Sequence, residues 1–160
     1  MKNWLIFGVV FILSLSLVIS VIVLWKATAP FNDIEQQAEE LALDTKALAN
    51  ISESYVYNGN KPYVTVFGVD EYGKEKAIFV PISLEVKAMQ EVYLQDGISE
   101  QQALTAFHDE TSVKKVLHTK LGFEEPGAVW EITYMSESGS LNYVYLLFKD
   151  GQWWKRILNL

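Results

Sequence analysis

The chain has 160 residues, with 13 basic and 20 acidic side chains and a formal net charge of −7. An acidic protein is repelled by nucleic acid, so we expect no nucleic-acid partner. The sequence contains no cysteine, which excludes disulfides, thiol catalysis, cysteine metal sites and a cysteine-linked lipid.

The chain begins with an apolar run from Trp4 to Trp25 that carries no charge and no proline. As a helix, these 22 residues would extend roughly 33 Å, close to the ~30 Å hydrocarbon core of a bilayer. A tryptophan ends the run on each side, and Lys2 and Lys26 flank it, as is typical of residues at a membrane interface. Residues 1–26 are therefore predicted to be a short cytoplasmic segment and a single membrane-spanning helix.

Cleavage of this run as a signal peptide is the alternative, because Ala27-Thr28-Ala29 resembles a cleavage site. The run is longer than a typical signal core, and Pro30 would follow the cut, where its rigid ring fits a protease poorly. We therefore expect a retained anchor. Residues 27–160 hold eleven basic and twenty acidic side chains, a net charge of −9, and we place them outside the cytoplasm.

Residues 27–97 are predicted to form a first unit. Asn32 and Glu35 have capping-box spacing and indicate the start of a helix. The apolar stripe of that helix comprises Ile34, Ala38, Leu41, Ala42, Leu48 and Ala49. Strands and turns follow, whereas the pattern of Ser83 to Leu94 fits a helix and a strand equally well, and Tyr93 to Gly97 form the joint.

Residues 98–160 are predicted to form a second unit. Ser99 and Gln102 again have capping-box spacing, and the helix that follows presents Ala103, Leu104 and Phe107. Alternating strands come next, and the last one, Trp153 to Leu158, follows an Asp150-Gly151 turn.

The two units share a pattern. Glu35-Gln36-Gln37-Ala38 returns as Glu100-Gln101-Gln102-Ala103, and the strands after each helix align without a gap at an offset of 66 residues. Coincidence among short amphipathic segments is the alternative interpretation. The pattern favours an internal repeat of α+β class, with one helix packed on an antiparallel sheet in each unit.

The segments Ile98–Ala103 and Val129–Tyr134, with Gly139 and the closing Asp150-Gly151, resemble a PepSY-like domain. With the anchor and the first unit, the whole chain resembles the YpmB/TseB-like family of Firmicute membrane proteins. The resemblance implies two tandem cystatin-like units outside the membrane. It also implies a role in cell-wall (peptidoglycan) elongation through a class B penicillin-binding protein, and no catalytic residues.

The sequence itself carries no recognisable catalytic motif, so we expect no enzyme, metal, cofactor or small-molecule substrate. His108 and His118 are the only histidines, lie ten residues apart and lack ligand-spaced partners. Adjacent acids such as Glu124-Glu125 are expected to be a solvated face. Glu131 lies in an apolar strand, on the face opposite Trp130, and is a candidate contact residue.

Aromatic residues of the second unit are the candidate partner-binding site. Neighbouring strand residues point to opposite faces, so only one of Trp153 and Trp154 can enter the core. The other would lie on the far face of the sheet, with Tyr143 and Tyr145 or with Val144 and Leu146 depending on register, unless the first unit or the linker covers that face. A binding regulator is the favoured function. The alternative, an envelope protease inhibitor or chaperone-like module, would need a projecting apolar hairpin.

Overall fold

The computed structural model describes residues 2–110 and 113–160, and within its helices the side chains of residues 2, 5, 24–32, 109 and 110 are left aside. The first helix, α1, spans Lys2–Asp44. Within it, Ile6–Val23 is long and apolar enough to cross a membrane, with a mean hydropathy of 3.0. Such a helix is suited to a single-pass anchor.

The predicted membrane-interface residues are only partly visible. The Trp4 side chain is 83% exposed, as suits a ring at a membrane surface. The side chains of Lys2, Trp25 and Lys26 lie outside the described part of the structure.

The predicted helix start at Asn32 is wrong, because α1 continues through that position. A helix that has already formed extends at little cost, so a capping pattern inside it need not begin a new one. The predicted end is also wrong. The helix stops at Asp44, so Leu48 and Ala49 follow it, and Leu48 is buried whereas Ala49 is exposed.

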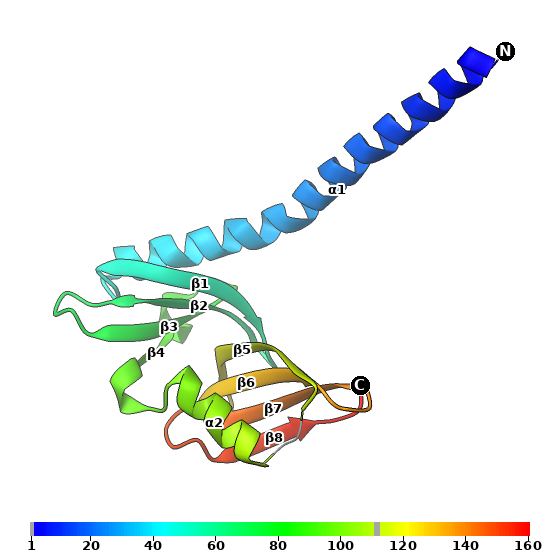
Figure 1. The fold of residues 1–160 in the computed structure, drawn as a ribbon. Helices are drawn as coiled ribbons and strands as arrows, with labels where there is room; N and C mark the ends of the chain where they lie inside the picture. The colour runs from blue at the N-terminus through cyan, green and yellow to red at the C-terminus, as the bar shows by residue number, and fades with distance from the viewer. Residues whose placement is uncertain (1, 111–112) are drawn as a thin grey trace. The chain divides into compact units, whose positions relative to one another are not determined.

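The first sheet is antiparallel with strand order β1-β2-β3-β4 (Figure 1). Its strands are β1 (Asn50–Asn58), β2 (Pro62–Val69), β3 (Glu75–Pro81) and β4 (Gln90–Tyr93). The ambiguous segment after β3 thus contains a strand, together with a 3₁₀ turn at Val86–Ala88. A second 3₁₀ turn at Leu94–Asp96 leads out of the sheet.

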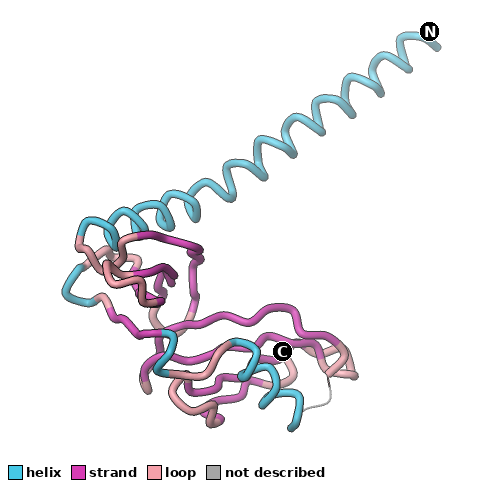
Figure 2. Tube along the Cα trace, turned by 60° about the vertical axis from the view of Figure 1, so that its left-hand side comes forward, coloured by secondary structure: helices cyan, strands magenta, loops and turns pink. Residues whose placement is uncertain are grey.

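The second sheet has the same antiparallel order, β5-β6-β7-β8. Its strands are β5 (Lys115–Glu124), β6 (Gly127–Met135), β7 (Leu141–Leu147) and β8 (Trp153–Ile157). Helix α2 (Glu100–Glu110) precedes it and lies along one face of this sheet (Figures 1 and 2). The α+β class, with helices packed on two antiparallel sheets, is confirmed.

The predicted cap of α2 is confirmed. The backbone N–H of Gln102 donates to Ser99 Oγ at 3.3 Å, and the Ser99 N–H donates to Gln102 Oε1 at 2.8 Å. Two donors that no helical carbonyl can reach are thereby satisfied.

The gap-free offset of 66 residues holds for only part of the chain. Val64 pairs with Val80, and Trp130 pairs with Leu146, which places β2–β3 and β6–β7 at that offset. In the first hairpins, β1 corresponds to β5 at an offset of 65 residues (121 − 56) instead of 66. Val56 pairs with Val64, whereas Leu121 pairs with Trp130. The physical cause is the hairpin loop, which has three residues between Asn58 and Pro62 but two between Glu124 and Gly127.

A continuous hydrophobic core joins the two sheets. The Phe123 ring of β5 lies 5.9 Å from the ring of Tyr63 and 5.3 Å from that of Phe79, measured between centroids. Phe107 of α2 is fully buried in the same cluster. The last turns of α1 hold the edge of the first sheet, because Glu35 accepts from the Val56 N–H at 3.1 Å and Glu39 accepts from the Ser54 hydroxyl at 2.6 Å.

Candidate functional site

The second sheet has two unlike faces, because alternate residues of each strand point in opposite directions. One face carries Trp130, Ile132 and Tyr134 and packs against α2, where the Phe107 and Tyr134 rings lie 4.9 Å apart. The opposite face, which we call the outer face, is built from the side chains of His118, Lys120, Glu131, Thr133, Tyr143, Tyr145, Trp154, Lys155 and Ile157.

The two adjacent tryptophans of β8 lie on different faces. The Trp153 ring faces α2, 6.3 Å from the Phe107 ring, and the guanidinium of Arg156 stacks 3.8 Å above it. The Trp154 ring meets Tyr145 edge-on at 5.9 Å on the outer face. Both indoles are half-buried. The Trp154–Tyr145 pair, with the half-buried Tyr143 beside it, is therefore the aromatic part of the outer face.

Glu131 lies at the centre of the outer face and is 8% exposed. It points away from α2, as the sequence predicts, yet neighbouring side chains cover it. Tyr145 is its cross-strand neighbour on β7, and His118 Nε2 lies 3.7 Å from its Oε1. Burial, followed by the negative charge of Glu131, raises the pKa of Tyr145. The phenol therefore remains a neutral hydrogen-bond donor.

The two histidines differ in their surroundings. His118 Nε2 is 2.9 Å from the Thr133 hydroxyl, and its side chain is 45% exposed. His108 is exposed on α2 beside the Phe107 ring. No group of three or more metal-ligating side chains occurs among the described residues.

Strand β1 forms one wall of a groove over the outer face. The Tyr57 ring lies over Gly122, where any larger residue would collide with it. Lys120 Nζ donates to the Val56 carbonyl at 3.0 Å. The groove continues past Glu131 to Tyr143, Tyr145 and the end of the chain. The first sheet thus covers the β5 side of the outer face and leaves the β7–β8 side accessible.

Glu124 is not part of a solvated acidic face, so that expectation is wrong. It is 7% exposed and accepts a hydrogen bond from the Tyr57 hydroxyl at 3.1 Å. Burial and the charges of Glu131 and Glu124 together raise the pKa of Tyr57. The two-residue hairpin after β5 places Glu124 on the outer-face side, whereas Glu125, inside the turn, is exposed.

Comparisons with known proteins identify relatives of this chain. Residues 37–81 match the family model described as a cell wall elongation regulator TseB-like domain. The chain is 28% identical over 152 residues to the "Probable cell wall elongation regulator TseB" of Bacillus subtilis, covering 95% of this chain and 92% of that protein. It also resembles the solved structure of the YpmB protein from Bacillus subtilis, with a TM-score of 0.68 and 28% identity, covering 76% of this chain and 94% of that one.

Proposed function

Because this chain is similar to TseB-like proteins in sequence and in fold, we propose that it is a membrane-anchored, non-enzymatic regulator of cell-wall elongation. It acts by binding another envelope protein through the outer face of its second sheet. The helix at Ile6–Val23 anchors it in the cell membrane, and residues 27–160 lie outside the cytoplasm.

The half-buried Trp154 ring, on the side of the outer face that strand β1 leaves uncovered, is the observation that carries this proposal. The Trp154 ring packs edge-on against Tyr145, which is 7% exposed, and the half-buried Tyr143 lines the groove beyond strand β1. Aromatic side chains at the centre of an interface contribute most of its binding energy. The buried Tyr145 supports the Trp154 ring edge-on, and a ring held in place before binding lowers the entropic cost of binding.

The partner is a class B penicillin-binding protein, a peptidoglycan transpeptidase. This assignment comes from the resemblance of the chain to the YpmB/TseB-like family. The Thr133 hydroxyl lies 2.9 Å from His118 Nε2, but Thr133 is only 1% exposed, so this hydroxyl is closed to a substrate and a non-enzymatic role suits the site. His118 contacts Thr133 and Glu131 and is bonded to neither a serine nor a second histidine among the described residues.

The inhibitor or chaperone-like alternative is less well supported. A cystatin-like inhibitor would insert a projecting apolar hairpin into its target. The first hairpin loops of the two sheets are three and two residues long, and they carry polar side chains at Asn60, Lys61 and Glu125.

Site-specific photo-crosslinking in living cells tests the proposal. A photoreactive amino acid replaces Trp154 in one strain and Tyr72 in a control strain, because Tyr72 is 85% exposed in a turn of the first sheet. We expect position 154 alone to capture a class B penicillin-binding protein, identified by mass spectrometry. Capture at position 72 and not at 154 would contradict the outer face, and capture of no transpeptidase from either position would contradict the partner.

A further inference from the structure

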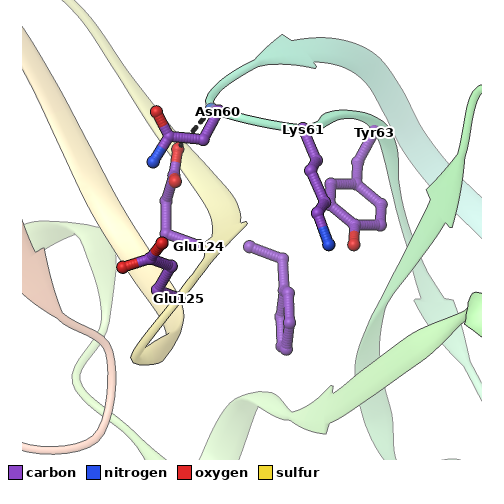
Figure 3. Close-up of a pocket in the computed structure, with 6 residues that line it drawn as sticks. Asn60, Lys61, Tyr63, Glu124 and Glu125 are labelled. Atoms are coloured by element: carbon purple, nitrogen blue, oxygen red, sulfur yellow. Dashed lines mark hydrogen bonds between the residues drawn. The ribbon is translucent and has the colours of Figure 1, made fainter.

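A second pocket lies where the first hairpins of the two sheets meet, away from the aromatic part of the outer face. It has a volume of about 560 Å³ and is lined by Asn60, Lys61, Tyr63, Phe123, Glu124 and Glu125. Figure 3 shows Glu124 and Glu125 on one side, with Lys61 and Tyr63 on the other. Two acidic groups and one basic group give the pocket a net negative charge.

Glu124 is the unusual member of this pocket. Its Oε1 accepts two hydrogen bonds, from the Tyr57 hydroxyl at 3.1 Å and from the Asn60 backbone N–H at 3.2 Å. Its Oε2 is buried and has no hydrogen-bond partner. A buried carboxylate oxygen without a donor is costly, so a group that brings a donor to it gains more than it would at a solvated acid.

The remaining walls favour a positive donor. Glu125 is exposed beside Glu124 and adds a second negative charge. Tyr63 and Phe123, whose rings meet edge-on, supply aromatic surface, which attracts cations. Lys61 is exposed, and no ion pair joins it to either glutamate in the part of the chain that the structure describes. Its flexible ammonium can therefore move aside into solvent.

We propose that this pocket binds a cationic side chain, a lysine ammonium or an arginine guanidinium, presented by the partner protein. The inference rests on the proposed function in that the chain has a protein partner. It adds a second contact with the same partner, which is electrostatic, whereas the contact at Trp154 is aromatic. The ammonium or guanidinium group approaches Glu124 Oε2, with Glu125 and the aromatic rings around it.

The test is a peptide titration of the full-length chain in lipid nanodiscs, observed by NMR at the Asn60 amide, whose N–H donates to Glu124. The probe is acetyl-Gly-Lys-Gly-amide, and its neutral control replaces lysine with norleucine. We expect a saturable shift with the lysine peptide and none with the norleucine peptide. Glu124→Gln should weaken binding about tenfold or more, because a hydrogen bond between two charged groups is stronger than one to a neutral amide.

Three further arms complete the design. Glu137→Gln, an exposed site in the β6–β7 turn, should leave binding unchanged. Lys61→Ala should tighten it, because a like charge is removed. 1,5-Diaminopentane should bind no more tightly than the peptide. Thermal melting of each variant in the nanodisc verifies that it is folded.

Several results would overturn the inference. These are an equal shift with norleucine, no saturable shift with lysine, or unchanged affinity in folded Glu124→Gln. Weaker binding of the lysine peptide to Lys61→Ala would show that Lys61 supports the ligand rather than repelling it. If diaminopentane binds and the lysine peptide does not, the ligand of this pocket would be a small-molecule amine and not a protein side chain. The titration uses no penicillin-binding protein, so its failure is distinguishable from failure of the outer-face proposal.

Discussion

Two neighbouring tryptophans have different structural roles. Trp153 packs on Phe107 of α2 and under Arg156, so Trp153→Ala removes core contacts. Because the ring is only half-buried, we expect a loss of about 2–3 kcal/mol in the free energy of unfolding, at or below the lower end of the ~3–5 kcal/mol typical of buried Trp→Ala substitutions. Trp154→Ala should cost much less. Urea denaturation of both variants measures this, and equal losses would contradict the assignment of the two rings.

Because several tyrosines are buried, we expect the stability of the fold to fall at alkaline pH. Burial raises the pKa of Tyr57, and the charges of Glu131 and Glu124 add to the effect. The folded state thus favours the neutral phenol, so this stabilisation is complete below the ordinary tyrosine pKa of about 10 and is lost as the pH rises above it. Urea denaturation at pH 8 and pH 10.5 should give lower stability at pH 10.5, and Tyr57→Phe should reduce the difference. An equal difference in the variant would show that Tyr57 is not the cause.

For single residues, the sequence predicts the face on which a side chain lies when the alternation of its own strand determines that face. Period-two alternation places Trp153 and Trp154 on opposite faces whatever surrounds them. It could not place Glu124, whose burial depends on Tyr57 from another sheet. The charge pair Glu124-Glu125 gives no local sign that one acid is enclosed.

At the scale of elements, the existence of the strands was predictable, and their register was less so. The alternating pattern located both sheets, but a hairpin one residue longer shifts the correspondence of β1 and β5 by one position. Tyr55 and Leu121, which the gap-free alignment equates, are bonded to each other instead, since the Leu121 N–H donates to the Tyr55 hydroxyl at 2.8 Å. The length of α1 was missed because capping patterns also occur inside helices.

The cap of α2 gives a prediction for that element. Ser99→Ala removes the acceptor for the Gln102 N–H and should cost about 1 kcal/mol of stability. Thr105→Ala is the control, because the Thr105 hydroxyl only bonds back to the Gln101 carbonyl within the helix, and alanine is the better helix former. Chemical denaturation measures both. A larger loss in the control than in Ser99→Ala would contradict the importance of the cap.

For the whole molecule, we expect the N-terminal helix to remain attached. The apolar segment Ile6–Val23 is as long as a membrane span, and Pro30 disfavours cleavage after Ala29. Intact-mass analysis of the protein purified from membranes should therefore find residues 1–26. A mature chain that begins near Pro30 would instead indicate a cleaved signal peptide.

The affinity of the membrane-anchored, full-length chain for its partner tests the whole account. The measurement is the Kd for a class B penicillin-binding protein, with both proteins in nanodiscs, for the native chain, Trp154→Ala and the control Tyr72→Ala. Loss of a large aromatic anchor typically costs ~2 kcal/mol or more, so Trp154→Ala should weaken binding about thirtyfold. Tyr72→Ala should bind like the native chain. Unchanged affinity in a folded Trp154→Ala variant would contradict the central claim that the outer face of the second sheet is where the partner docks.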